Sequence, residues 1–169
     1  VNAILAGSVG LVKAGTGTLL LNGLNTYTGE TIITQGRLLL GATDRLVTTG
    51  SLTLNGGAFD VGGFEQTLSN FTLNGGEITN GTLYAGTFAL NSGTVNGRLA
   101  GNGSAVKGMN GLVVLNAETT FTGGLTISGG TLRLGDNERL LDSGNVWLNG
   151  GTLDLNGFTE HINTLILRS

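Results

Sequence analysis

Short runs of alternating apolar and polar residues fill this chain, and most of them end in a turn that contains glycine. Five such runs are residues 52–57, 71–76, 88–93, 125–130 and 146–151. Alternation with a period of two predicts a β-strand with one buried face, and Asn-Gly or Gly-Gly predicts a turn after it. The pattern therefore predicts an all-β chain made of many short strands.

The spacing of these runs distinguishes two architectures. Leu54, Leu73 and Leu90 hold equivalent places and follow one another after 19 and 17 residues (73 − 54 and 90 − 73). This is the length of one circuit of a coil. The strand pattern at 152–155 follows the glycine pair 150–151 at once, as in a hairpin, so an antiparallel sandwich or barrel is the alternative. Because successive units agree in length and order, we predict a right-handed parallel β-helix (solenoid) of about seven to eight rungs, each of about 20 to 25 residues.

A longer repeat is superimposed on this pattern. Lys13 returns as Lys107, an offset of 94 residues (107 − 13), and residues 1–75 are equivalent to residues 95–169 throughout. Glycines and alternating apolar positions persist in the repeat, which indicates repeated geometry rather than a binding site. Since the sequence starts at Val1 and has a partial repeat at each end, we expect residues 1–169 to be a single β-helix fragment of a longer chain.

Composition narrows the class of protein. The chain has 32 Gly, no Pro, no Cys and only 11% charged residues, which disfavours helices, a disulfide framework and disorder. A net charge of −3 and a pI near 4.9 give no basic face for nucleic acid. No apolar run is long enough for a membrane-spanning helix. We therefore expect no nucleic-acid partner and no direct membrane insertion.

Threonine and asparagine fill the polar positions. A β-branched side chain suits an exposed strand face, and Asn at a strand end tolerates the left-handed conformation and can form hydrogen-bonded ladders. The outward threonines are predicted at Thr18, Thr26, Thr28, Thr53, Thr72, Thr94, Thr126 and Thr152, and the corner asparagines at Asn22, Asn55, Asn74, Asn91, Asn116 and Asn149.

Residues 11–41, LVKAGTGTLLLNGLNTYTGETIITQGRLLLG, resemble the passenger-associated transport repeat of bacterial autotransporters. The positions that match this family's pattern are Lys13, Gly15, Gly17, Leu19, Leu21, Asn25, Tyr27, Gly29, Thr31, Ile32, Gly36, Leu38, Leu40 and Gly41. A second, degenerate copy spans residues 105–135, with the matching positions Lys107, Gly111, Phe121, Gly123, Ile127, Gly130, Leu132, Leu134 and Gly135. In that copy Met109 and Asn110 replace Gly15 and Thr16, and Phe121 replaces Tyr27.

The resemblance implies a parallel β-helix in the passenger of an autotransporter, exported through the bacterial outer membrane to the cell surface or secreted. It implies a structural role that assists transport and folding. We expect the segment itself to act without catalysis and without a cofactor. The implied partners are the protein's own translocator β-barrel and neighbouring β-helix rungs. An adhesin surface that binds host glycan, matrix or sister cells is the alternative function, and a carbohydrate-active enzyme is the third.

Several residues are candidates for chemistry. Asp136, Glu138 and Asp142 offer oxygen ligands for calcium, but the calcium-binding glycine-rich nonapeptide is missing, so a solvated loop is favoured. Asp60 and Asp154 could act as catalytic carboxylates, but they lie a whole long repeat apart, whereas glycoside hydrolysis needs them within about 5–10 Å. We therefore predict no metal site and no catalytic site.

The remaining candidates are aromatic residues and one histidine. The equivalent pairs Tyr27 and Phe121, and Phe64 and Phe158, are predicted to stack in the core. Trp147 stands where the first repeat has Thr53, on an outward position, and is the best candidate for a surface contact with a sugar or a partner; a shielded surface aromatic is favoured. His161 is the only histidine and is predicted to be exposed. The Gly-x-Gly at residues 15–17 lacks the helix of a nucleotide loop and is predicted to be a turn.

Overall fold

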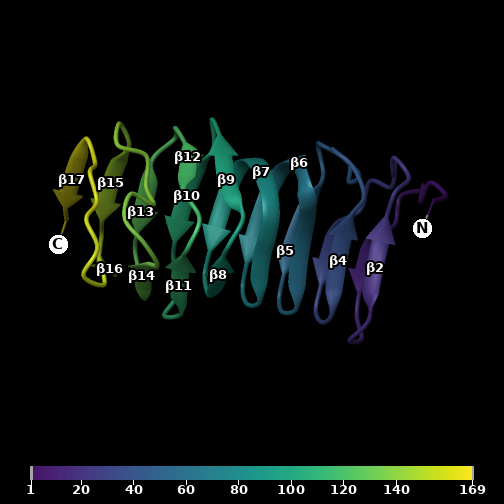
Figure 1. Cartoon of the computed structure of the whole chain (residues 1–169), viewed down its shortest axis with the longest axis horizontal. Helices are drawn as coiled ribbons and strands as arrows, with labels where there is room; N and C mark the ends of the chain where they lie inside the picture. The colour runs from purple at the N-terminus through teal and green to yellow at the C-terminus, as the bar shows by residue number, and fades with distance from the viewer. Residues whose placement is uncertain (1, 169) are drawn as a thin grey trace.

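The computed structural model describes residues 2–168, which form strands, turns and loops (Figure 1). This part of the chain contains no helix, and therefore none that could span a membrane. The strands are β1 (Leu11–Lys13), β2 (Thr18–Leu21), β3 (Thr31–Ile33), β4 (Arg37–Leu40), β5 (Ser51–Leu54), β6 (Ala58–Leu73), β7 (Glu77–Leu90), β8 (Gly93–Val95), β9 (Arg98–Gly101), β10 (Ser104–Lys107), β11 (Leu112–Leu115), β12 (Thr119–Phe121), β13 (Leu125–Ile127), β14 (Thr131–Leu134), β15 (Asn145–Leu148), β16 (Thr152–Asp154) and β17 (Thr164–Leu167).

The chain winds as a parallel β-solenoid of about 8 turns, as the sequence predicts. Every strand pairing among residues 2–168 is parallel. The hairpin alternative at β15 and β16 is wrong: β15 pairs with β13 and β17, whereas β16 pairs with β14. At the glycine turn between them the chain therefore passes from one face of the solenoid to the next, and the two strands do not pair with each other.

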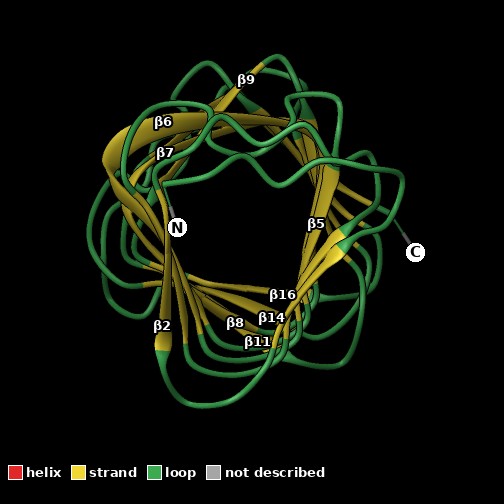
Figure 2. Cartoon of the chain, turned by 90° about the vertical axis from the view of Figure 1, so that its right-hand side faces the viewer, coloured by secondary structure: helices red, strands yellow, loops and turns green. Residues whose placement is uncertain are grey.

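Three faces surround the axis, as the view along it shows (Figure 2). Face 1 consists of β1, β3, β5, the C-terminal parts of β6 and β7, β10, β13, β15 and β17. Face 2 consists of β2, β4, the N-terminal parts of β6 and β7, β8, β11, β14 and β16. Face 3 consists of the middle parts of β6 and β7 with β9 and β12, and loops continue it towards both ends.

The circuits on face 1 are 17 to 21 residues long, which is somewhat shorter than predicted. Residues that stack above one another along its central outward column are Val12, Ile32, Thr53, Thr72, Ala89, Val106, Thr126, Trp147 and Ile166. Val12 and Val106 are 94 residues and five steps of this column apart. The long repeat of the sequence is therefore a whole number of circuits, which returns each residue type to the same face.

The interior is an apolar column built from the inward residues of all three faces. Leu52, Phe71 and Phe88 stack in register on face 1, and the ring of Phe88 lies 5.6 Å from that of Phe121, centroid to centroid. Each of the first three is at most 1% exposed. Since side chains alternate across a strand, the period-two pattern places one apolar residue above another in every circuit.

The prediction that Phe64 stacks in the core is wrong, and so is the left-handed conformation at the corner asparagines, whereas their hydrogen-bonded ladders are confirmed. Phe64 is 38% exposed, while Phe158 packs against the core as predicted. None of the six predicted corner asparagines adopts a positive φ; the non-glycine residues that do are Asp44, Asn80, Glu138 and Asn156. At the corner after β5 it is Gly57 that has the left-handed conformation, with φ of 74°. Asn55, two residues earlier, instead accepts a hydrogen bond from the side-chain amide of Asn74 in the next circuit.

Candidate functional site

The first motif residue, Lys13, is a lysine in a core position. It ends β1 and stacks in register with Ile33, so its side chain points inward and only 7% of the residue is exposed. Its Nζ donates hydrogen bonds to the carbonyls of Ala14 at 3.1 Å, Gly15 at 2.7 Å and Gln35 at 3.0 Å. Gln35 belongs to the following circuit, so the ammonium group closes its own corner and joins it to the next one.

Lys107 repeats this arrangement in the second copy. It is fully buried and stacks in register with Ile127, and its Nζ donates to the carbonyls of Met109 and of Gly129, the latter at 3.2 Å. Burial lowers the pKa of Lys107, because a charged ammonium group loses its hydration there. The corner carbonyls replace part of that hydration.

Glycines of the motif make room for these contacts. A Cβ atom on Gly36 or on Gly130 would overlap backbone carbonyl oxygens and would lie 2.6 Å from the lysine Nζ of its copy. A Cβ on Gly41 or Gly135 would overlap the side-chain oxygen of Asn22 or of Asn116. These motif glycines are therefore required by close approach between circuits. Gly17 has open space instead, since no heavy atom lies within 4 Å of the Cβ it would carry.

Asn25 joins three consecutive circuits. It is 2% exposed; its Oδ1 accepts from the backbone N–H of Leu5 at 2.9 Å, and its Nδ2 donates to the carbonyls of Arg45 at 2.8 Å and Gly23 at 3.0 Å. In the second copy Thr119 takes this place, and its hydroxyl donates to the carbonyl of Arg139 at 2.9 Å. The second copy thus keeps the bond to the following circuit.

The motif aromatic residue also changes together with its partner. Tyr27 is buried, as predicted, and its hydroxyl lies 2.6 Å from the Thr31 hydroxyl oxygen. The second copy has Phe121 and Leu125 at these two positions, and both are buried. A buried polar pair is therefore replaced by an apolar pair, so that no hydroxyl is left without a partner.

The motif leucines and isoleucines mark the inward positions. Leu21, Leu38, Leu40, Leu132, Leu134 and Ile127 are at most 1% exposed, and Leu19 packs against the core while partly exposed. Ile32 differs, because it lies in the outward column of face 1 and is half-buried. The inward residue that corresponds to Ile127 is Ile33, one position further along (127 − 94). Gly15, with φ of 75°, forms the predicted turn.

A polar network that the sequence analysis did not identify holds the loops of face 3. In the first copy Gln66 is fully buried: its Oε1 accepts from the Leu46 N–H at 2.9 Å, and its Nε2 donates to the carbonyls of Leu46 at 3.2 Å and Thr67 at 2.6 Å. Asp44 accepts from the Thr67 N–H at 2.8 Å. A glutamine at the end of an alternating run does not by itself indicate a buried hydrogen-bond network. Only its equivalence to Glu160, 94 residues later (160 − 66), could have indicated that the position is special.

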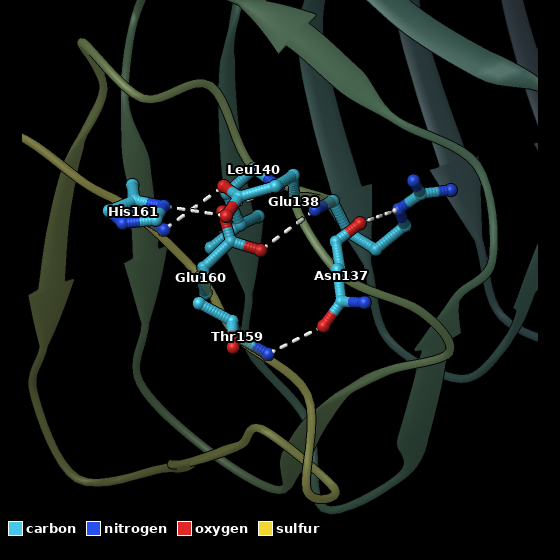
Figure 3. Close-up of polar contacts among 7 residues, drawn as sticks. Asn137, Glu138, Leu140, Thr159, Glu160 and His161 are labelled. Carbon is cyan, nitrogen blue, oxygen red and sulfur yellow. Dashed lines mark hydrogen bonds and ion pairs between the residues drawn. The ribbon is translucent and has the colours of Figure 1, made fainter.

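The second copy builds the same network from ionisable residues (Figure 3). Glu160 replaces Gln66 and accepts from the N–H groups of Arg139 at 2.7 Å and Leu140 at 3.1 Å. Glu138 replaces Asp44 and forms an ion pair with the exposed His161, with Nδ1 2.6 Å from Oε1. This pairing raises the pKa of His161 and lowers that of Glu138, while burial raises the pKa of Glu160.

The other candidate residues are engaged in local contacts. Within residues 2–168, no three His, Cys, Asp or Glu side chains are arranged to hold a metal ion. Asp60 is buried in an ion pair with Arg37, and Asp154 pairs with Arg133 at 2.7 Å. Trp147 is half-buried on face 1; its ring covers Gly124, where a Cβ would overlap it. These are contacts of the solenoid wall, and a further contact of Trp147 with a sugar or partner stays a prediction.

Comparison with known proteins agrees with this geometry. The family described as passenger-associated transport repeat matches residues 11–40 and 110–134, which contain Lys13, Asn25 and Thr119, whereas Lys107 lies three residues before the second match. No solved structure matches the chain significantly.

Two of the relatives found are autotransporters. The chain is 30% identical over 149 residues to the adhesin BmaC autotransporter of Brucella suis, and 30% identical over 183 residues to the probable autotransporter YfaL of Escherichia coli. The alignments cover 88% and 92% of this chain but only 4% and 15% of the relatives. The chain is an autotransporter passenger-like β-helical segment with passenger-associated transport repeats.

Proposed function

We propose that the two motif copies assist export and folding of the passenger by locking each new circuit onto the one before it. The observation that carries this proposal is Asn25, whose amide binds the circuit before it through Leu5 and the circuit after it through Arg45. These bonds form only when neighbouring circuits are stacked. Because solenoid stability is a sum of nearest-neighbour terms, every locked circuit opposes return of the chain into the membrane channel.

Composition supports the same role. The chain has no Cys that could form a disulfide in an oxidising compartment before transport, and no Pro whose isomerisation would delay folding afterwards. Its autotransporter relatives indicate export through the outer membrane, to the cell surface or into the medium. The partners that fit this role are the translocator domain of the same protein and further β-helix rungs.

A role without catalysis is part of the proposal. Asp60 and Asp154 are separated by five circuits, about 24 Å at roughly 4.8 Å a circuit, which is too far for a catalytic pair. Each of the two is also neutralised by an arginine. Structural ion pairs explain both carboxylates.

The test is export of variants. The segment replaces the aligned segment of the E. coli relative, and surface-exposed passenger is measured by its accessibility to protease on intact cells. We expect Asn25→Leu, which removes three hydrogen bonds, to reduce the exported fraction several-fold, whereas Thr26→Ala at the exposed neighbouring position leaves it unchanged. If Asn25→Leu lowers the stability of the isolated segment but exports normally, locking does not drive transport.

Adhesion is a second candidate, and the charge distribution on face 1 favours it. None of the nine residues in its central outward column is charged. The ionised pairs of Arg37 with Asp60 and of Arg133 with Asp154 lie on face 2. These nine residues form an uncharged column, beside which the Glu30 carboxylate accepts a hydrogen bond from the Thr53 hydroxyl. Such a column suits contact with an uncharged surface, including a second copy of the segment on a sister cell.

Self-association tests this candidate, with the segment itself as the probe. Sedimentation at rising concentration is expected to detect weak association that salt weakens little, because the nine residues of the column carry no charge. The double change Thr53→Lys and Thr72→Lys on face 1 is expected to abolish it, and Thr79→Lys on face 2 to leave it intact. Equal behaviour of the two variants would exclude face 1 as the adhesive surface.

A further inference from the structure

Three corners of the solenoid have an identical sequence. Leu-Asn-Gly-Gly occupies residues 54–57, 73–76 and 148–151, in each case at the end of a face 1 strand. Identical neighbours give the three asparagines the same intrinsic reactivity. Any difference in their chemistry must therefore come from the surrounding circuits.

Asn-Gly is a reactive step in a polypeptide. The backbone nitrogen of the glycine attacks the side-chain carbonyl carbon of the asparagine, forms a new C–N bond in a five-membered succinimide ring and expels the side-chain nitrogen as ammonia. Water then opens the ring to aspartate or isoaspartate. The reaction requires no partner except water, but the asparagine side chain must be free to turn towards the glycine nitrogen, and that N–H must be available.

At Asn74 both requirements are blocked. Its Nδ2 donates to Oδ1 of Asn55 at 2.8 Å, and its Oδ1 accepts from Nδ2 of Asn91, also at 2.8 Å. The N–H of Gly75 donates to the carbonyl of Leu54 at 3.2 Å. The amide ladder holds the side chain in place from both sides, and the attacking nitrogen is engaged.

Asn55 is held on one side only. Its Oδ1 accepts from Asn74, while neither its Nδ2 nor the N–H of Gly56 has a hydrogen bond to any described residue. Asn55 is the first member of the ladder, so the circuit before it supplies no amide. We expect its reactivity to lie between those of the other two corners.

The side chain of Asn149 is held on neither side. Its backbone N–H donates to the carbonyl of Ile127 at 2.8 Å, but within residues 2–168 its side chain and the N–H of Gly150 make no hydrogen bond. The residue is exposed, as is Gly150. In the preceding circuit the equivalent position is Ser128, which has no amide to continue a ladder.

We propose that Asn149 is a site of spontaneous succinimide formation, and that the ladder Asn55–Asn74–Asn91 protects the chemically identical corner at Asn74. Conversion at Asn149 adds one negative charge to a chain of net charge −3. The isoaspartate product also lengthens the backbone at the corner between β15 and β16. The asparagine ladder of the solenoid is thereby assigned a chemical role in addition to its hydrogen bonds.

The test is peptide mapping by mass spectrometry after incubation of the folded segment in mildly alkaline buffer. Conversion is expected to be fastest at Asn149, slower at Asn55 and slowest at Asn74, with at least a several-fold difference between Asn149 and Asn74. In urea, where the circuits are unfolded, the three corners should convert at one common rate. Equal rates in the folded segment, or faster conversion at Asn74 than at Asn149, would overturn the proposal.

A variant separates protection by the ladder from protection by the corner backbone. Asn55→Ser removes the acceptor of the Asn74 amide at an exposed position and should raise the conversion rate at Asn74 several-fold. The rate at Asn149 in the same sample is the internal control and should not change. An unchanged rate at Asn74 would show that the ladder gives no protection.

Discussion

At the scale of single residues, the polar side chains inside the solenoid act as cross-links between circuits. Lys13, Asn25, Gln66, Lys107 and Thr119 are all buried, and each donates to backbone carbonyls. Within the described residues no buried side-chain nitrogen or oxygen lacks a hydrogen-bond partner. A buried donor or acceptor without a partner is costly, so these residues strongly favour one register of stacking.

Lys107→Met tests the cost of losing such a cross-link. The change keeps an unbranched apolar stem but leaves the carbonyls of Met109 and Gly129 without the donor, so we expect a loss of about 1–3 kcal/mol in the free energy of unfolding. Urea denaturation measures it, with Val106→Thr at the exposed neighbouring position as the control. Equal stability of Lys107→Met and the unchanged chain would contradict the role of the ammonium group.

Lys107 also makes the free energy of unfolding depend on pH, and the same variant tests this. The pKa of Lys107 is lowered in the folded chain, so between that pKa and the ordinary lysine value the unfolded chain binds more protons. Stability from this residue therefore rises as the pH rises through that interval. Lys107→Met should lack this slope, and identical slopes for the two proteins would contradict the assignment.

His161 is the only histidine, so its titration can be followed without overlap by NMR. Its pairing with Glu138 raises its pKa, and Glu138→Gln should return that pKa towards the ordinary histidine value. Because the folded pKa is raised, the pairing stabilises the chain below the ordinary value and is lost as the pH rises through the folded pKa. Glu30→Gln, a distant control, should leave the titration unchanged; an unshifted pKa in Glu138→Gln would mean that the pair does not form in solution.

At the scale of elements, the two copies build equivalent loops from different residues. Asp44 and Glu138 both adopt a positive φ, near 50°, and both accept a backbone N–H from the following circuit. Gln66 and Glu160 both accept the N–H groups of the loop one circuit earlier. The loop geometry is conserved between the copies, while its charge is not.

Exchanging glutamine and glutamate at positions 66 and 160 tests whether the two loops are equivalent in energy. Gln66→Glu places a carboxylate in a fully buried position and removes the donor to Leu46 and Thr67, so we expect a loss of about 1–3 kcal/mol at neutral pH that shrinks in acid as the carboxylate is protonated. Glu160→Gln should act in the opposite direction. The pKa of Glu160 is raised, so its charged form is disfavoured in the fold, and its contribution is lost as the pH rises through that pKa.

Thermal unfolding of both variants at neutral and acid pH decides the matter. At neutral pH, Glu160→Gln should unfold at a higher temperature than the unchanged chain. Its unfolding temperature should also vary less with pH. A stabilising Gln66→Glu, or a destabilising Glu160→Gln, would mean that the two loops are not equivalent in energy.

At the scale of the whole molecule, the solenoid is a stack in which each circuit contacts only its neighbours. The 94-residue repeat contains five circuits, so Lys13 and Lys107 lie on the same corner about 24 Å apart at roughly 4.8 Å a circuit. A repeat that was not a whole number of circuits would move the motif to another face. The stack should therefore tolerate removal of whole circuits.

Deletion of residues 74–90 tests this expectation. It removes one circuit of 17 residues and joins Leu73 to Asn91, which takes the place of Asn74. We expect a folded chain with a slightly smaller urea m-value, since less surface is buried. Deletion of residues 74–82 removes only part of a circuit, misplaces the following face and should abolish cooperative unfolding. If both deletions behave alike, stability does not depend on whole circuits.

The amino-acid sequence by itself determined the all-β class, the parallel stacking, the length of the repeat and the apolar identity of most inward residues. This was possible because alternation along a strand and glycine at a corner are local signals that recur in every circuit. The motif leucines and Ile127 also face inward, whereas Ile32 faces outward between Val12 and Thr53.

Only the tertiary structure decided what each circuit meets above and below it. It buried Lys13 among apolar residues and exposed Phe64. It also bonded the Gln66 side chain of β6 to the loop residue Leu46, and it distinguished Asn74 from Asn149 within one identical tetrapeptide. These outcomes depend on neighbours about 20 residues away along the chain, whose side chains occupy or leave open the space and the hydrogen-bonding groups at each corner. A periodic pattern specifies the stack, but the contacts between particular circuits arise only once the stack has formed.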